Sequence, residues 1–285
     1  MIRIGIVGSD NSHAITFSQM INDQNHKYHV DGMKVLYLYG LDEERNREVS
    51  EKGGIPYIVK RPEDMIDKID CVFIEFRDGA LHYKYAKLFI EAGIPVFIDK
   101  PLAASVDDAE KIVSLAIKNN VLLTSFSALR FSRIVQEVKH IRDEIVTLSI
   151  TGPGDPDSIY SGLIFYGIHV AEIVEEILGP FSGKVYAVRK GKTILGVLEV
   201  DNGPLVSILI SNDIPYHFSI RALTKSQVIY SKIEDFMECY KNGLLTVKRM
   251  LKEREWPLKV NDMIVPIKVI KAVEESYTKG TTVRF

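Results

Sequence analysis

The sequence contains little cysteine, no long apolar run and no excess of either charge. Its 285 residues include two cysteines, 36 lysines and arginines, and 38 aspartates and glutamates, for a net charge of −2. The two cysteines form no Cys-x-x-Cys motif, so we expect reduced structural thiols and a cytoplasmic protein. The balanced charges indicate no nucleic-acid track and no membrane-binding surface. No apolar stretch reaches the roughly 20 residues that span a bilayer, and we expect no signal peptide.

Recognised metal-binding and hydrolase motifs are also missing. His26, His29 and Asp31 occur close together in a polar segment, but their spacing is not that of a zinc site. We therefore expect a solvated loop there and predict no metal ion. A Gly-x-Ser-x-Gly motif is absent as well, so nothing supports a serine hydrolase.

The chain has the length and the hydrophobic content for two domains. It is 46% hydrophobic and 26% charged, which is ordinary for a globular protein. In residues 1–124, short apolar runs alternate with amphipathic stretches, which predicts a Rossmann-type doubly wound parallel sheet of α/β class. The predicted strands are 3–7, 34–39, 56–59, 70–76, 95–99 and 121–126. A helix over 105–119 is predicted from the apolar stripe Ala109, Ile112, Val113, Ala116 and Ile117.

Residues 125–285 have a different pattern, which predicts an α+β domain with a mostly antiparallel open sheet. Its predicted strands are 145–151, 184–190, 194–200, 205–211 and 217–223. Asp201-Asn202-Gly203 is a hairpin signal between two of them. Helices are predicted at 135–142, before Gly179-Pro180, at 233–240 and at 266–277.

The turn after the first predicted strand has the layout of a dinucleotide-binding loop but lacks two of its glycines. The pattern Gly-x-Gly-x-x-Gly is replaced by Gly8, Asp10 and His13. A helix N-terminus can bind pyrophosphate through its amides, and glycine allows close approach. Asn11 or Ser12 can cap the helix and still donate to phosphate. The alternative is a plain strand–helix connection with Asp10 or Ser12 as its N-cap.

The end of the second predicted strand is a weaker indication of a cofactor. A carboxylate there would bind the ribose hydroxyls, but Gly40 occupies that position. Asp42 follows two residues later, where we consider it both as a cofactor contact and as the cap of the next helix. We see no adjacent basic cluster in the sequence for a 2′-phosphate.

Asp99-Lys100-Pro101 follows a buried strand and precedes a capped helix. At these residues the chain resembles the Gfo/Idh/MocA oxidoreductase family, whose corresponding strand ends in Glu-Lys-Pro. Four further motifs resemble the family in the same order. They are the helix "LHYKYAKLFIEAG" with His82, preceded by Arg77-Asp78 in place of Thr-Pro; "SALRF" with Arg130-Phe131; "YGIHVAEIVEEILGP" with Gly167, His169 and Glu172; and the closing "VIKAVEESYTKGTTVRF".

The resemblance implies NAD or NADP as cofactor and hydride transfer with a sugar, polyol or cyclitol substrate. Lys100 would orient the substrate oxygen and stabilise negative charge on it. His169 would be the general base. The acidic partner of this histidine in the family falls on Phe165, so Glu172, Tyr160 or Tyr166 would have to help. We place Tyr160 and Tyr166, with Lys100 and His169, at the substrate.

The resemblance also implies further cofactor contacts and an oligomer. Besides the loop Gly8–His13 and Asp42, we assign cofactor contacts to Arg77, His82, Asp99, Lys100, Pro101 and Arg130. A homo-oligomer, dimer or tetramer, would form through the C-terminal sheet. Because Asp10, Gly40 and Phe165 depart from the family pattern, a non-catalytic ligand-binding or regulatory protein is the alternative. A nucleotide-independent lyase or isomerase on the same fold is a third reading.

Overall fold

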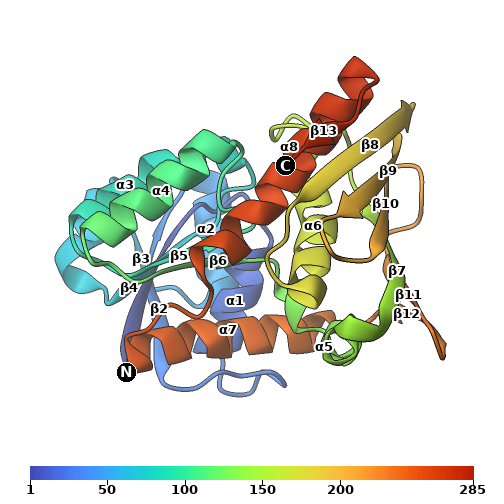
Figure 1. Cartoon of the computed structure of the whole chain (residues 1–285). Coiled ribbons are helices and arrows are strands. Elements are labelled where there is room, and N and C mark those ends of the chain that lie inside the picture. The colour runs from blue at the N-terminus through green and yellow to red at the C-terminus, as the bar shows by residue number, and fades with distance from the viewer. The chain divides into compact units, whose positions relative to one another are not determined.

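The computed structural model describes residues 1–285 and divides the chain into two compact units (Figure 1). Unit 1 consists of Met1–Ala103, Asp107–Phe126 and Tyr240–Leu258, and unit 2 of Ala104–Val106, Ser127–Cys239 and Lys259–Phe285. The chain leaves unit 1 after Phe126 and returns to it over Tyr240–Leu258. The predicted domain boundary between residues 124 and 125 stays a prediction.

Unit 1 is built on a six-stranded sheet in which all pairings are parallel. The strand order is β3-β2-β1-β4-β5-β6. The strands are β1 (Ile2–Val7), β2 (Met33–Tyr39), β3 (Tyr57–Ile58), β4 (Cys71–Ile74), β5 (Val96–Asp99) and β6 (Leu123–Phe126). Every residue of β4, β5 and β6 is buried, as expected of strands covered on both faces. This confirms the predicted Rossmann-type sheet.

Helices follow the strands of unit 1 in alternation. They are α1 (His13–Asn22), α2 (Glu43–Gly53), α3 (His82–Glu91) and α4 (Val106–Lys118), with the 3-10 helices η1 (Pro62–Lys68) and η2 (Gly79–Leu81). Helix α7 (Phe236–Glu253) begins in unit 2 and belongs to unit 1 from Tyr240 on. The predicted stripe of α4 is buried except for Ile117, which is 59% exposed. Its inclusion in the stripe was wrong, because the helix ends one residue later and its last turn faces solvent.

Unit 2 contains a seven-stranded sheet in the order β12-β11-β7-β10-β9-β8-β13. Only the β7–β10 pairing is parallel, which confirms the mostly antiparallel open sheet. The strands are β7 (Ile145–Pro153), β8 (Gly183–Lys190), β9 (Thr193–Val200), β10 (Leu205–Ser211), β11 (Phe218–Thr224), β12 (Val228–Ile233) and β13 (Val283–Arg284). The hairpin at Asp201-Asn202-Gly203 joins β9 to β10 as predicted.

The helices of unit 2 cover one face of this sheet. They are α5 (Arg133–His140), α6 (Ile164–Leu178) and α8 (Val260–Lys279), with the 3-10 helices η3 (Ala128–Phe131) and η4 (Arg142–Glu144). Helix α6 packs against β7, β10 and α8 and is buried along most of its length. It therefore carries polar side chains, among them His169 and Glu172, into the interior. None of the helices in the structure combines the length and apolar character needed to cross a membrane.

Candidate functional site

The turn between β1 and α1 depends on the glycine at its first position. Gly8 has a φ of +113° and donates its N–H to the Tyr39 carbonyl over 2.8 Å. A Cβ at this position would lie 2.5 Å from the backbone nitrogen of Phe76. The turn thus passes too closely over the end of β4 for any residue but glycine.

The Asp10 carboxylate is turned into the protein. Its Oδ2 accepts a hydrogen bond of 3.2 Å from the backbone N–H of Arg77, in the segment after β4. Its Oδ1 is buried with no hydrogen-bond partner. Asp10 is therefore not the cap of α1, and its position in the glycine pattern does not place a carboxylate over the helix N-terminus.

Asn11 and His13 connect the turn to the end of β5. Asp99 Oδ2 accepts from Asn11 Nδ2 over 2.8 Å and lies 2.9 Å from His13 Nδ1. The other ring nitrogen of His13 is 3.2 Å from the Tyr240 hydroxyl, on the part of α7 that belongs to unit 1. The predicted loop residues Asn11, His13 and Asp99 are thus brought together. Each of these three side chains has a protein partner.

The N-terminus of α1 fits an anionic pyrophosphate group. Ser12 is the exposed N-cap residue, and its side chain makes no capping hydrogen bond. Arg45 of α2 brings a guanidinium beside the turn, where its Nε donates to the Ser9 carbonyl over 2.9 Å and its Nη1 pairs with Glu48. Helix N-terminal amides and a nearby guanidinium both favour a bound anion. The sequence analysis missed Arg45, which is distant from the turn in the chain.

The end of β2 cannot carry the carboxylate that usually binds ribose. A Cβ on Gly40 would overlap Ser9 Oγ and Asn46 Oδ1. Asp42 caps α2, because its Oδ1 accepts from Arg45 N over 3.0 Å. A cavity of about 600 Å³ opens at this edge. It is lined by Tyr39, Gly40, Leu41, Glu43, Asn46, Arg47, Ile58, Val59 and Lys60.

Two basic side chains line this cavity, and the sequence analysis did not predict that they share a site. Arg47 comes from α2, and Lys60 follows β3. They are 13 residues apart in the chain, so no local basic cluster could be read. A cavity at the carboxyl end of β2 is where a doubly wound sheet binds the adenosine part of a dinucleotide.

Lys100 follows β5 at the carboxyl edge of the parallel sheet and is only 4% exposed. The peptide bond to Pro101 is cis. The buried His82 lies between this turn and the end of β4, with Nδ1 2.7 Å from the Pro101 carbonyl and Nε2 2.9 Å from that of Phe76. Burial lowers the pKa of His82. His82 therefore supports the backbone around Lys100, and the cofactor contact assigned to it stays a prediction.

Glu75 is a buried acid that the sequence analysis did not single out. It is fully buried, and neither carboxyl oxygen has a hydrogen-bond partner. Burial, together with Asp99 and Asp10, raises its pKa well above the usual value. Burial and the two nearby carboxyl groups therefore favour the protonated form of Glu75.

In unit 2, His169 lies among aromatic side chains. Its ring centroid is 5.5 Å from that of Tyr166 and 5.3 Å from that of Phe218. Phe165 contacts Tyr160 and Tyr166, each with a centroid separation of 4.9 Å. The structure thus brings together the residues predicted for the substrate in this unit, and Phe165 packs among them instead of supplying an acid.

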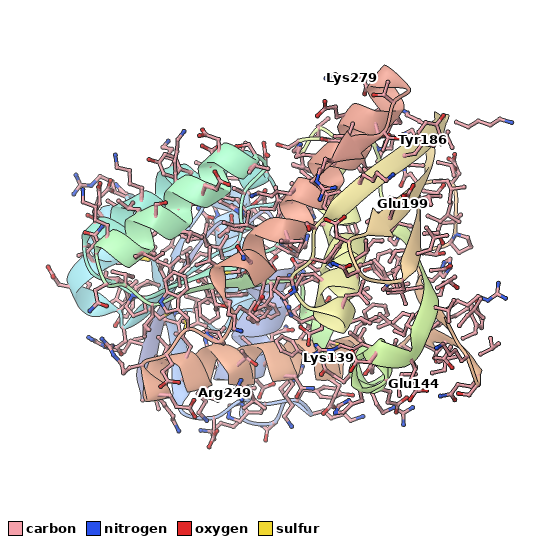
Figure 2. The ribbon with its side chains drawn as sticks, viewed as in Figure 1. Lys139, Glu144, Tyr186, Glu199, Arg249 and Lys279 are labelled. Carbon is pink, nitrogen blue, oxygen red and sulfur yellow. The ribbon has the colours of Figure 1, made fainter.

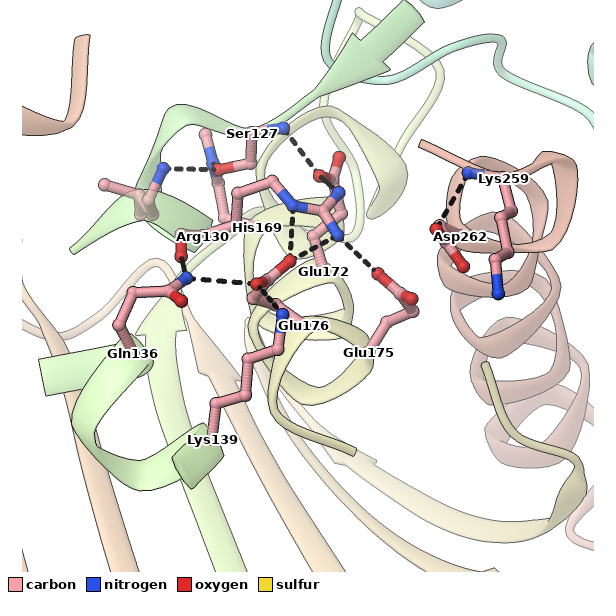
Figure 3. Close-up of polar contacts among 11 residues, drawn as sticks. Ser127, Arg130, Gln136, Lys139, His169, Glu172, Glu175, Glu176, Lys259 and Asp262 are labelled. Atoms are coloured by element: carbon pink, nitrogen blue, oxygen red, sulfur yellow. Dashed lines mark hydrogen bonds and ion pairs between the residues drawn. The ribbon is translucent and has the colours of Figure 1, made fainter. Parts of the chain in front are cut away.

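Ser127 is the observed hydrogen-bond partner of His169 (Figure 3). Its Oγ lies 2.6 Å from His169 Nδ1, and both residues are buried. Its backbone N–H donates to Glu172 Oε2 over 2.6 Å. The sequence analysis named Glu172, Tyr160 and Tyr166 as helpers but missed Ser127. The only signal was its position as the first residue of "SALRF".

Arg130 is a buried anchor between η3 and α6. Its guanidinium lies 2.8 Å from Glu175, 2.6 Å from Glu176 and 3.5 Å from Glu172 (Figure 3). Burial acts to lower the pKa of Arg130, but these carboxylates outweigh it and raise the pKa. With its side chain 2% exposed, Arg130 is occupied inside unit 2. The structure gives no support for the cofactor contact assigned to Arg130, which stays a prediction.

Comparison with known proteins finds a family match for the N-terminal part of the chain. Residues 2–127 match a family described as an oxidoreductase family with an NAD-binding Rossmann fold. This confirms the predicted class of cofactor at the level of the family. The matched residues include the turn at Gly8, the end of β5 and Ser127.

Curated relatives are distant and only partly covered. A myo-inositol 2-dehydrogenase of Thermotoga maritima is 24% identical over 206 residues, covering 65% of this chain and 58% of the relative. A scyllo-inositol 2-dehydrogenase (NADP(+)) of Bacillus subtilis is 27% identical over 150 residues, covering 52% and 43%. The chain spans about half the length of the curated relatives it matches.

Solved structures share the fold over the full chain. The myo-inositol dehydrogenase of Lactobacillus casei, in complex with NAD(H) and myo-inositol, superposes with a TM-score of 0.85 at 12% identity, covering 100% of this chain and 97% of that one. The scyllo-inositol dehydrogenase of the same organism gives 0.85 at 15% identity, with 100% and 99% covered. At such low identity the likeness establishes the architecture alone.

Proposed function

We propose that this chain, which belongs through residues 2–127 to the Gfo/Idh/MocA oxidoreductase family, is a dehydrogenase that acts on a polyol or cyclitol hydroxyl with NAD or NADP. The observation that carries the proposal is Lys100. A lysine that is 96% buried, directly after β5, occupies the edge where α/β sheets bind ligands. The distant inositol dehydrogenase relatives support the substrate class.

The residues that hold the cofactor come from unit 1. The amides at the start of α1, the Ser12 hydroxyl and the Arg45 guanidinium receive the pyrophosphate. The cavity at the end of β2 receives the adenosine part, with Arg47 and Lys60 on its wall. When bound, the nicotinamide ring accepts a hydride from the substrate carbon or donates one to it.

On the family resemblance, we assign Lys100 of unit 1 and His169 of unit 2 each a role in the reaction. In oxidation, the substrate would give the hydride of its C–H bond to the nicotinamide and its O–H proton to His169 Nε2, and a C=O bond would remain. The Lys100 ammonium orients the oxygen and stabilises the negative charge that develops on it. Tyr160 and Tyr166 belong to the aromatic group around His169, where rings can pack on the C–H face of a cyclic polyol.

The first test is calorimetric titration of cofactor-free protein with NADH and NADPH, followed by a screen of polyols and cyclitols. We expect micromolar binding, about −8 kcal/mol, and a roughly 100-fold lower kcat in Lys100→Met. Exposed Lys118→Met, in the last turn of α4, is the control and should keep full activity. No binding at millimolar cofactor would rule out the dehydrogenase, and full turnover in Lys100→Met would remove Lys100 from the mechanism.

A second function is favoured by Phe165. This residue fills, with an apolar ring, the position where the family resemblance implies an acid. A non-catalytic binding or regulatory protein would tolerate that change. It would bind cofactor or polyol in the same titrations but show no hydride exchange with any bound polyol.

We also propose a homo-oligomer formed through the open face of the unit 2 sheet. Apolar side chains are exposed on several neighbouring strands of this face, including Tyr186 on β8 (Figure 2). The full set is Val146, Tyr186, Val188, Leu195, Val197, Leu205, Val228 and Tyr230. Exposed apolar side chains on a sheet face are typical of an interaction surface, and we assign this face to a second copy of the chain.

A further inference from the structure

The segment that follows β6 is attached to α6 by two residues of that helix. His169 and Glu172 are three positions apart, so they lie on the same face of α6. His169 Nδ1 lies 2.6 Å from Ser127 Oγ, and Glu172 Oε2 accepts the Ser127 N–H over 2.6 Å (Figure 3). Two side chains on one face of α6 thus form hydrogen bonds with the hydroxyl and the backbone N–H of Ser127.

A buried ionic cluster holds this segment one turn further on. Arg130 of η3 is 2.8 Å from Glu175 and contacts Glu176 and Glu172. Lys139 Nζ and Gln136 Nε2 each donate to Glu176 Oε1, over 2.6 and 3.0 Å. Because Arg130 and its three acidic partners are buried and mutually bonded, they hold η3, the segment directly after Ser127, against α6.

We propose that Ser127 is the positioning residue of His169: its Oγ accepts a hydrogen bond from Nδ1–H, so that the lone pair of the ring is on Nε2 and can take the substrate proton. The inference rests on the proposed role of His169 as base. The Ser127 oxygen also accepts from the Leu129 N–H over 3.3 Å. A serine oxygen can accept two hydrogen bonds, so both donors are satisfied and the ring is held in one orientation.

A serine hydroxyl can take the place of the missing carboxylate because the partner of His169 only has to accept a hydrogen bond from Nδ1–H. A base at Nε2 requires the neutral ring to carry its proton on Nδ1, because a ring protonated at Nε2 has no lone pair there. The oxygen of Ser127 accepts from Nδ1–H before and after Nε2 gains a proton. No proton has to leave Ser127 at any step.

The first test needs no substrate. In protein labelled with [15N]histidine, the two ring nitrogens of His169 are assigned by loss of their signals in His169→Gln, and the tautomer of the neutral ring is read from their shifts. We expect the Nδ1–H form in the wild type and a shift toward the Nε2–H form in Ser127→Ala. An Nε2–H ring in the wild type, or an unchanged ring in Ser127→Ala, overturns the proposal.

Turnover separates a positioning role from a structural one. Ser127→Ala should lower kcat about 10- to 100-fold, the cost of a misplaced catalytic group, with KM for the substrate little changed. Ser127→Thr, which keeps the hydroxyl, should restore most of the loss. Ser132→Ala is the matched control, since this buried serine bonds to Asp235 over 2.7 Å in the same segment.

The failures of the two proposals are distinguishable. Absence of cofactor binding or turnover in the wild type refutes the dehydrogenase, while the tautomer still reports on the contact between Ser127 and His169. Turnover that needs His169 but is equal in Ser127→Ala and the wild type refutes the role of Ser127 and leaves the dehydrogenase intact.

Discussion

Glu175 and Glu176 are neighbours on α6 and share Arg130, yet their carboxyl groups are held in opposite states. Burial raises the pKa of Glu175 to about 8, although Arg130 acts to lower it. For Glu176, contacts with Arg130, Lys139 and Gln136 outweigh burial and hold its pKa below the usual value. One buried guanidinium cannot compensate three carboxylates, so the acid with fewest donors keeps its proton.

Glu175 predicts a loss of stability as pH rises. Its pKa of about 8 in the folded protein exceeds the ordinary value of 4.5, so the folded state binds more protons between these values. The free energy of unfolding therefore falls with pH in that window, by about 2 kcal/mol between pH 6 and 8 from this group. Urea unfolding at a series of pH values measures the slope.

The matched variant is Glu175→Gln, which has no proton to lose and keeps an oxygen toward Arg130. We expect its free energy of unfolding to fall less steeply than that of the wild type over pH 6 to 8. Glu144→Gln, at an exposed acid of η4, should leave the slope unchanged. Parallel pH profiles for wild type and Glu175→Gln would show that Glu175 is already ionised in the folded protein at pH 6.

At the scale of elements, the start of α2 allows a test of whether Asp42 caps the helix or binds the cofactor. The Asp42 side chain accepts from the Arg45 N–H over 3.0 Å, which is an N-cap bond. Asp42→Ala should therefore lower the free energy of unfolding by about 1 kcal/mol, while Asp42→Ser should retain most of it. The dissociation constant for NADH should be the same in all three proteins. A tenfold weaker affinity for NADH in Asp42→Ser would instead identify Asp42 as a cofactor contact.

Elements that obey one regular pattern were predictable from the sequence, and elements that break it were not. The parallel strands read as continuous apolar runs, and all six were found. Helix α8 begins six residues before the predicted start because Pro266 lies inside it, where proline usually marks a beginning. Strand β12 was not predicted, since its residues at the sheet edge are mostly exposed.

The same distinction between regular and irregular patterns holds for the residues of the candidate site. Asp99, Lys100 and His169 could be placed because each stands next to a regular strand or on a regular helix. Ser127, Arg45 and Glu75 could not, because their importance arises from tertiary contacts. The 2.6 Å approach of Ser127 to His169 joins residues 42 positions apart, and no local pattern reports such a distance.

At the scale of the whole molecule, the open face of the unit 2 sheet exposes apolar side chains that a single chain does not cover. Tyr230 is 64% exposed and Val228 66% exposed on β12, and Leu195 is 43% exposed on β9. Alternating burial on β8 and β9 shows that the other face of these strands is the core. The exposed apolar residues therefore do not belong to the interior of a single chain.

If a second copy covers this face, as we propose, the particle in solution is larger than the 32.2 kDa of one chain. Stable dimers bury roughly 800 Å² on each partner, so charged residues at the centre of the face should break the contact. We expect light scattering after size exclusion to give a dimer or tetramer for the wild type and a monomer for Leu195→Lys with Val197→Lys. Ile159→Lys, at an 86% exposed apolar residue of unit 2 outside the sheet, is the control and should keep the wild-type mass.

The same measurement decides whether assembly and the site depend on each other. His169 and Ser127 are buried on the helix side of the sheet, whereas Leu195 and Val197 are on the opposite side. A monomeric double variant should therefore keep the His169 tautomer of the wild type. If the wild type is itself a monomer at micromolar concentration, the proposed homo-oligomer is refuted. If the double variant is a monomer with an altered His169 ring, the sheet transmits the contact to α6.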